Sequence, residues 1–194
     1  FTYLEGRDVV DPKRISLVGF SVGSSIAMVA AEDPLINERV HSLVFFGGYF
    51  NIFDYITSLF RKSMVSDGQS LSWEPAEGAL THVEEILATN NISKEEFERQ
   101  RFSEETRAKL MRYSPDMHIE DFKARIFILH ERSDTYVPYV ESLKLKRAVE
   151  GKIATTFHLA SLFEHILPKT GFSFEMIREF GGLLLFLSEI FMYL

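Results

Sequence analysis

The sequence of 194 residues predicts an α/β fold in which short parallel strands alternate with helices. Four short apolar runs lack strict apolar–polar alternation, which is typical of strands covered on both faces of a sheet. Patterns with helical spacing lie between these runs. Near the start, a strand, a helix and a second strand follow one another within about 30 residues, which indicates a βαβ unit with a right-handed crossover.

The core elements are predicted in chain order from their apolar patterns and their breakers. A first helix is expected over residues 1–10 and ends at Asp11, because the residue before Pro12 avoids the α-helical region. The predicted strands are residues 15–20, 40–46, 124–130 and 153–159. The remaining predicted core helices are residues 21–31, 138–150 and 168–194.

A long segment between the second and third strands, residues 51–121, has no convincing strand pattern. Apolar residues at helical spacing and capping signals at Ser93 and Ser103 predict several helices there. We therefore expect a core of residues 1–50 and 122–194 with residues 51–121 inserted into it. Insertions after parallel strands border the ligand crevice, so this one is expected to be a cap or lid. The alternative is a second small domain.

Composition and charge exclude several classes of function. The 46% hydrophobic content indicates a globular chain, and the net charge of −7 argues against binding to nucleic acid or an anionic membrane. Without cysteine there are no disulfides or thiolate metal sites, and no histidine pair has metal-ligand spacing. We expect no metal and no cofactor. No signal peptide is visible, which leaves the compartment open with the cytoplasm favoured.

The end of the chain is almost wholly apolar over residues 181–194. As a helix this segment spans about 21 Å, too short for a bilayer core of about 30 Å. We expect it to pack against the sheet instead of spanning a membrane.

The motif that points to chemistry is a G-x-S-x-G pentapeptide between the first strand and the second helix. Its residues are Gly19, Phe20, Ser21, Val22 and Gly23. In a strand–turn–helix context this motif holds the serine on a strained turn with its hydroxyl exposed. The two glycines are expected where a Cβ would collide with neighbouring backbone. The N–H of the residue after the serine would stabilise an oxyanion.

A nucleophilic serine needs a base, and the base needs a carboxylate to orient it. After this motif the partners are expected in the order serine, acid, histidine. Asp134 lies in the loop after the third strand, and Glu131 in the same loop is the fallback acid. His165 follows the last strand and is the candidate base. The other five histidines lie in strands or in the insertion.

Three segments resemble the α/β-hydrolase-fold serine hydrolases, nearest to the dienelactone-hydrolase and prolyl-oligopeptidase-like branch. They are residues 11–23, 134–138 and 163–165. The family pattern at the acid loop often reads His-Gly-x-x-Asp-x-x-Val-Pro, and Glu131 stands at its glycine position. The resemblance covers nearly all of the chain except residues 51–121. It implies a partial α/β-hydrolase fold: about four mostly parallel strands flanked by helices, with a helical cap between the second and third strands.

The resemblance also implies an activity: cleavage of a carboxylic ester, or with less support an amide or peptide, through an acyl-enzyme on Ser21. Asp134 and His165 would complete the triad. The alternatives are a non-catalytic interaction protein with this fold and an acyltransferase that uses the same triad. The substrate would be a small ester or acyl compound whose identity the sequence does not specify.

Family members have about eight strands, so the earlier strands and the second oxyanion donor would lie upstream of Phe1. We therefore expect these 194 residues alone to be weakly active or inactive. The strand before Ser21 would be an unpaired sheet edge, through which the chain is expected to form homodimers.

Overall fold

The computed structural model describes residues 1–99, 103–161, 163–164, 167–168 and 174–194. Its centre is a four-stranded sheet in the order β1-β2-β5-β6, in which every neighbouring pair is parallel. These strands are β1 (Leu17–Phe20), β2 (Ser42–Phe46), β5 (Arg125–Glu131) and β6 (Thr155–Ala160). Each coincides with a predicted apolar run within a few residues. The predicted α/β class and parallel sheet are therefore confirmed.

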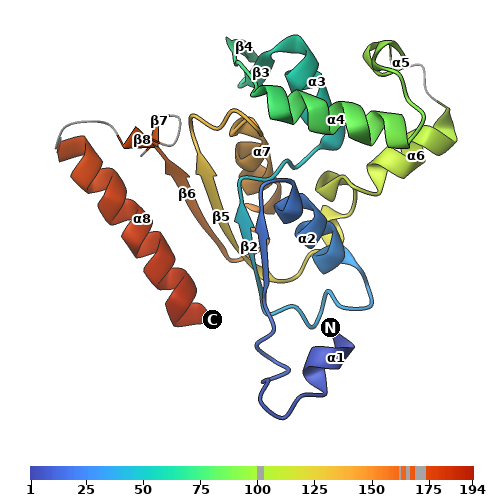
Figure 1. Ribbon diagram of the computed structural model, residues 1–194. Helices are drawn as coiled ribbons and strands as arrows, with labels where there is room; N and C mark the ends of the chain where they lie inside the picture. Colours follow the sequence, from blue (N-terminus) through green and yellow to red (C-terminus); the bar gives the residue numbers. More distant parts are fainter. Residues whose placement is uncertain (100–102, 162, 165–166, 169–173) are drawn as a thin grey trace.

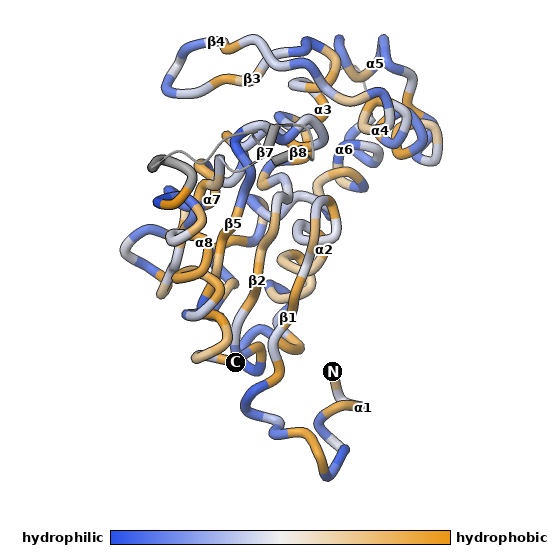
Figure 2. Tube along the Cα trace, turned by 60° about the vertical axis from the view of Figure 1, so that its left-hand side comes forward, coloured by the Kyte–Doolittle hydropathy of each residue, from blue (hydrophilic) through white to orange (hydrophobic). Residues whose placement is uncertain are grey.

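Helices cover both faces of this sheet (Figure 1). On one face, α2 (Val22–Glu32) and α7 (Val140–Val149) bury a cluster that includes Met28, Phe45 and Ile128. On the other face, α8 (Phe174–Tyr193) packs through Phe186 and Ile190 onto β2, β5 and β6. Figure 2 shows why this arrangement is stable: the strands are hydrophobic over most of their length and need cover on both sides.

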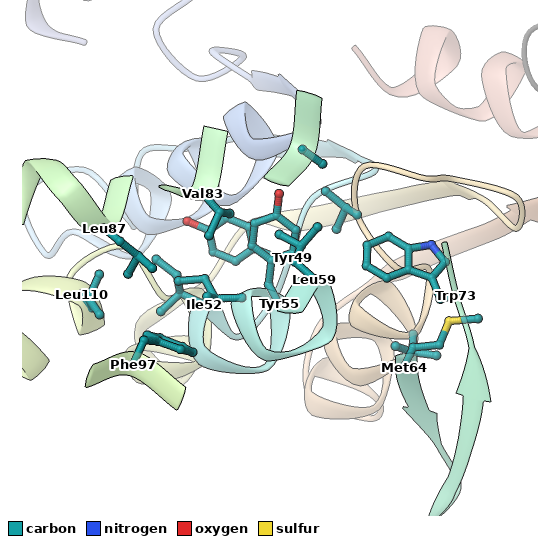
Figure 3. Packing of buried hydrophobic residues seen from close by; sticks show 14 of the residues in the cluster. Tyr49, Ile52, Tyr55, Leu59, Met64, Trp73, Val83, Leu87, Phe97 and Leu110 are labelled. Atoms are coloured by element: carbon teal, nitrogen blue, oxygen red, sulfur yellow. The ribbon is translucent and has the colours of Figure 1, made fainter. Parts of the chain in front are cut away.

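Most of the segment between β2 and β5 lies beyond the carboxyl ends of the strands, and its last part runs back beside α2 to the start of β5 (Figure 1). Its elements are α3 (Ile52–Arg61), β3 (Ser63–Ser66), β4 (Gln69–Ser72), α4 (Glu77–Thr89), α5 (Lys94–Glu98), α6 (Glu104–Met111), η1 (Pro115–Met117) and η2 (Ile119–Asp121). They enclose an apolar cluster of their own (Figure 3). Val137 and Val140, which follow β5, belong to the same cluster and join the insertion to the core.

Polar contacts fix the two ends of the insertion to each other and to α7. The Asn51 side chain caps α3 and donates to Asp116 at 2.6 Å, while the Ile52 N–H donates to the Ser114 hydroxyl at 2.9 Å. The fully buried Glu141 accepts from the N–H groups of Phe50 and Asn51. Burial raises the pKa of Glu141, and the adjacent Lys144 opposes that shift.

The capping signals in the insertion have the predicted structure. Ser93 accepts from the Glu96 N–H at 3.2 Å, and the Glu96 carboxylate accepts from the Ser93 N–H at 2.8 Å, which completes a capping box on α5. Ser103 caps α6 by accepting from the Thr106 N–H.

The expectation that residues 51–121 contain no strand is wrong. β3 and β4 form an antiparallel hairpin whose turn is Asp67 and Gly68, both in the left-handed region at φ 50° and 77°. Asp-Gly is a strong signal for a two-residue hairpin turn, but the flanking strands are short and rich in serine. Their apolar pattern was too weak to be recognised as strand.

Two terminal predictions also change. The predicted helix over residues 1–10 is reduced to α1 (Thr2–Glu5), which ends at Gly6 because glycine disfavours continued helix. After β6 the chain forms two short paired strands, β7 (Phe163–Glu164) and β8 (Leu167–Pro168), that the sequence did not predict.

Candidate active site

Ser21 occupies the sharp turn between β1 and α2. Its φ of 51° and ψ of −138° lie outside the favoured regions for a residue with a side chain, and it is one of four such residues with positive φ in the described chain. Its N–H donates to the Phe46 carbonyl at 2.7 Å, which holds the turn against the end of β2. The residue is exposed, and its hydroxyl does not cap α2. The turn therefore presents a strained serine to solvent.

Gly19 has the close contact that the motif predicts. A Cβ at this position would lie 2.4 Å from the Cα of Ser24 and 2.8 Å from the carbonyl oxygen of Gly23. Since backbone atoms cannot yield, only glycine allows the first turn of α2 to pass over β1.

The close contact that was expected at Gly23 is absent from the described part of the chain. A Cβ there meets no atom of that part within 4 Å, because the first turn of α2 faces open space on this side.

Val22 is the first residue of α2, so its N–H has no carbonyl one turn earlier to bond within the helix. The positive end of the helix dipole lies at the same place. An anion that develops next to Ser21 would meet one backbone donor here. The neighbouring Phe20 side chain is exposed and stacks at a tilt on Phe46, with ring centroids 5.5 Å apart.

Asp134 lies in the loop directly after β5, as predicted. One oxygen of its carboxylate, Oδ1, accepts from the N–H groups of Tyr136 at 2.7 Å and Val137 at 3.1 Å. The other, Oδ2, lies 3.4 Å from Nε2 of His130. Burial, and next the negative charge of Asp134, raises the pKa of Tyr55 in the insertion well above its usual range. The contacts of its two oxygens thus fix the direction of the Asp134 carboxylate.

His130 contacts this loop from the buried end of β5, a role that the sequence did not reveal. It is fully buried at the end of β5, and its Nε2 lies 3.0 Å from the Val137 carbonyl, which can only accept. Nε2 therefore carries a proton, and Nδ1 lies 2.6 Å from the Ser142 hydroxyl. The one signal for this role in the sequence is the position of His130, four residues before Asp134.

Ser21 and Asp134 both lie close to the carboxyl end of β2. Phe46 accepts the Ser21 N–H, and the next residue, Gly47, would place a Cβ 3.4 Å from Oδ2 of Asp134. Gly47 has φ 65°, and its N–H donates to the Leu129 carbonyl of β5. The candidate nucleophile and the candidate acid therefore approach successive residues, Phe46 and Gly47, although 113 positions separate them in the sequence.

The fallback acid, Glu131, is the last residue of β5. Its Oε1 lies 3.3 Å from the Ser133 hydroxyl, and its Oε2 is buried without a hydrogen-bond partner in the described part of the chain. Asp134 is the acid adjacent to the turn after β2. The candidate base, His165, lies outside the described residues, so its position relative to Ser21 and Asp134 stays a prediction.

A pocket of about 360 Å³ opens between the first turns of α2 and the insertion. Val22 and Ile26 of α2 form one wall, and Ile86 of α4 forms part of the opposite wall. Tyr49, Ile52 and Tyr113 add to a mainly apolar lining, while His82 and Glu85 stand at its polar side. The pocket therefore lies next to Val22, whose N–H is the candidate oxyanion donor.

The described residues contain no group of three or more histidine, aspartate or glutamate side chains arranged to hold a metal ion. Within the same ranges, no helix combines the length and the apolar character that a bilayer crossing requires.

Comparison with known proteins places the fold. No family model and no curated protein matches the sequence. Among solved structures, the chain is similar to a Mycobacterium tuberculosis puromycin-hydrolyzing peptidase, with a TM-score of 0.59 and 16% identity over 99% of this chain and 24% of that one. It is similar to the uncomplexed acylaminoacyl peptidase of Pyrococcus horikoshii, with a TM-score of 0.57 and 14% identity over 96% of this chain and 26% of that one.

A third similar structure is acetyl xylan esterase 1 from a Thermoanaerobacterium species, with a TM-score of 0.57 and 12% identity over 95% of this chain and 47% of that one. The chain has a partial α/β-hydrolase fold. It spans about a quarter to about half of the length of these solved chains. At such identities the likeness concerns the fold, and the activity has to be argued from the site.

Proposed function

We propose that this protein is a serine hydrolase that cleaves a carboxylic ester through an acyl-enzyme on Ser21. The observation that carries the proposal is the strained, exposed Ser21 at the start of α2, with the Asp134 carboxylate on the other side of the same turn. Backbone strain at an exposed nucleophile is characteristic of catalytic turns. The similar solved structures include a protein named an esterase and proteins named peptidases.

In the proposed reaction, His165 removes the proton from the Ser21 hydroxyl as the oxygen attacks the ester carbonyl. Asp134 fixes the histidine tautomer and stabilises the imidazolium, and the Val22 N–H donates to the oxyanion. The imidazolium then protonates the departing alcohol. Water, activated by the same histidine, attacks the acyl-enzyme and releases the acid with Ser21 restored.

The insertion is proposed to act as a cap that supplies one wall of the substrate pocket. The pocket between α2 and α4 has an apolar floor next to Val22, so it would hold an uncharged acyl or alcohol group while Ser21 reacts. We place the ester ahead of the amide because an alcohol leaves more readily than an amine.

Covalent labelling tests the proposal. The intact natural protein is treated with a fluorophosphonate probe, digested, and the modified peptide is identified by mass spectrometry. We expect the label on Ser21, its loss in Ser21→Ala, and full labelling of Ser70→Ala, which removes a different exposed hydroxyl on β4. An unlabelled wild-type protein contradicts the proposal and favours the non-catalytic interaction protein. Label that persists in Ser21→Ala contradicts Ser21 as the nucleophile.

A further inference from the structure

Trp73 joins the insertion to the acid loop. It is the single tryptophan of the 194 residues, follows β4, and is only 8% exposed within the apolar cluster of the insertion. Figure 3 shows it at the same end of that cluster as Met64. Its indole Nε1–H donates to the backbone carbonyl of Asp134 at 2.8 Å. A buried indole N–H needs such a partner, and here the partner is the candidate acid.

Two neighbouring contacts extend this junction. The N–H of Ala76, which precedes α4, donates to the Thr135 carbonyl at 2.8 Å. The Tyr136 hydroxyl lies so close to Gly78 that a Cβ there would be 3.2 Å from it. Three successive loop residues are therefore held by one short stretch of the insertion. On its other side the loop rests on the buried His130.

Because the Asp134 carboxylate bonds the N–H groups of its own loop, its direction is set by the path of the loop backbone. Asp134 itself contributes the carbonyl that Trp73 binds. A shift of that carbonyl would carry the carboxylate with it.

We propose that Trp73 is a positioning residue: its indole N–H holds the acid loop and thereby fixes the direction of the Asp134 carboxylate. The catalytic part of this inference rests on the proposed hydrolase function. The direction of the Asp134 carboxylate would thereby depend on the contact between the insertion and the acid loop. This contact links the insertion, which forms one wall of the proposed substrate pocket, to the proposed triad.

Hydrogen exchange tests the junction without reference to activity. Trp73→Phe keeps an aromatic ring and removes the N–H, so exchange at the Tyr136 and Val137 amides is expected to rise roughly tenfold, the effect of one lost hydrogen bond. Exchange at Val44 in β2 should stay unchanged. The matched control is Asn37→Leu, because Asn37 is equally 8% exposed and its side chain donates to the Asp121 carbonyl. This control should leave the acid loop unaffected.

Kinetics on the intact natural protein test the catalytic part. We expect Trp73→Phe to lower kcat about tenfold at unchanged KM. The acid limb of the kcat/KM profile should move to lower pH, because a histidine deprived of its carboxylate has a lower pKa. A variant that is merely less folded loses activity without moving that limb. Asn37→Leu provides this comparison.

A second variant covers the case in which Trp73→Phe does not fold. Benzothienylalanine at position 73 has the shape of tryptophan with sulfur in place of N–H, and should reproduce the exchange and pH effects. Unchanged exchange at Tyr136 and Val137 in this variant would refute the junction. Faster exchange with an unmoved pH limb would refute the positioning role. If wild-type Ser21 is not labelled by a fluorophosphonate, the hydrolase proposal fails, while the exchange result still decides the junction.

Discussion

Gly19 is the residue on which the geometry of the Ser21 turn depends most directly. A methyl group there would overlap the Cα of Ser24, whose hydroxyl also donates to the Phe46 carbonyl at 2.8 Å. Gly19→Ala must therefore push α2 away from β1 and displace Ser21. We expect at least a hundredfold loss of fluorophosphonate labelling rate, on the scale of losing an oxyanion donor.

Gly23→Ala is the matched comparison, because a Cβ there meets no described atom within 4 Å and alanine favours helix over glycine. It should retain the labelling rate of the wild type. Equal rates in the two variants would show that the close approach at Gly19 does not position the serine.

Glu32 is a buried acid at the end of α2 whose carboxylate oxygens have no hydrogen-bond partner within the described ranges. Burial, followed by the charges of Asp116 and Asp121, raises its pKa to about 9. Between the unfolded value of 4.5 and about 9, the folded state holds a proton that the unfolded state has released. The contribution of Glu32 to stability is therefore complete below pH 4.5. It falls by about 1.4 kcal/mol per pH unit as the pH rises through this window.

Glu32→Gln removes this dependence, since the amide stays neutral in both states. The variant should gain stability relative to the wild type at pH 8 and much less at pH 5, as measured by urea unfolding at both values. Glu38→Gln, a change at an exposed acid six residues further along the chain, should give no such difference. A Glu32→Gln effect that is equal at both pH values would contradict the buried, protonated state.

At the scale of elements, the sequence was sufficient wherever a pattern was local. The four core strands coincide with short runs rich in apolar residues, and the caps at Ser93 and Ser103 depend on residues three positions away. Ser21 and Asp134 are predicted as site residues because each follows an apolar run that predicts a strand, and the loops after parallel strands converge at one edge of a sheet.

The β3–β4 hairpin and the junction around Asp134 could not be predicted in the same way. Half of the residues in the hairpin strands are serine, and the hairpin relies on the Asp67-Gly68 turn and on packing of Met64. The Trp73–Asp134 bond joins positions 61 residues apart, and nothing near either residue indicates the other. Such contacts are a property of the assembled fold.

At the scale of the whole molecule, β1 is one edge of the sheet in the described structure, and β6 is the other. Val18 and Phe20 on this strand are 52% and 65% exposed. An apolar edge with free backbone groups favours pairing with another chain, so we propose that these 194 residues self-associate through β1.

Val18→Lys should shift this chain toward monomer, because a charge on an edge strand opposes pairing. Light scattering after gel filtration over a range of concentrations measures the change. Val9→Lys adds the same charge at an exposed valine outside the sheet and should leave the mass distribution unaltered. If the wild-type chain is monomeric at every concentration, or if both variants behave alike, β1 is not the contact.

The hydrogen bond between Trp73 and Asp134 also bears on the order in which the chain folds. Closing a loop of 61 residues costs more entropy than closing the shorter loop that pairs β1 with β2, so we expect this bond to form after that pairing. Each β–α turn can form early from adjacent residues, and Ser21 would reach its strained conformation once β1 pairs with β2. The acid loop would follow only when the insertion has closed over it. During refolding, the fluorescence of Trp73 would then report when the insertion docks onto the acid loop, separately from the pairing of β1 with β2.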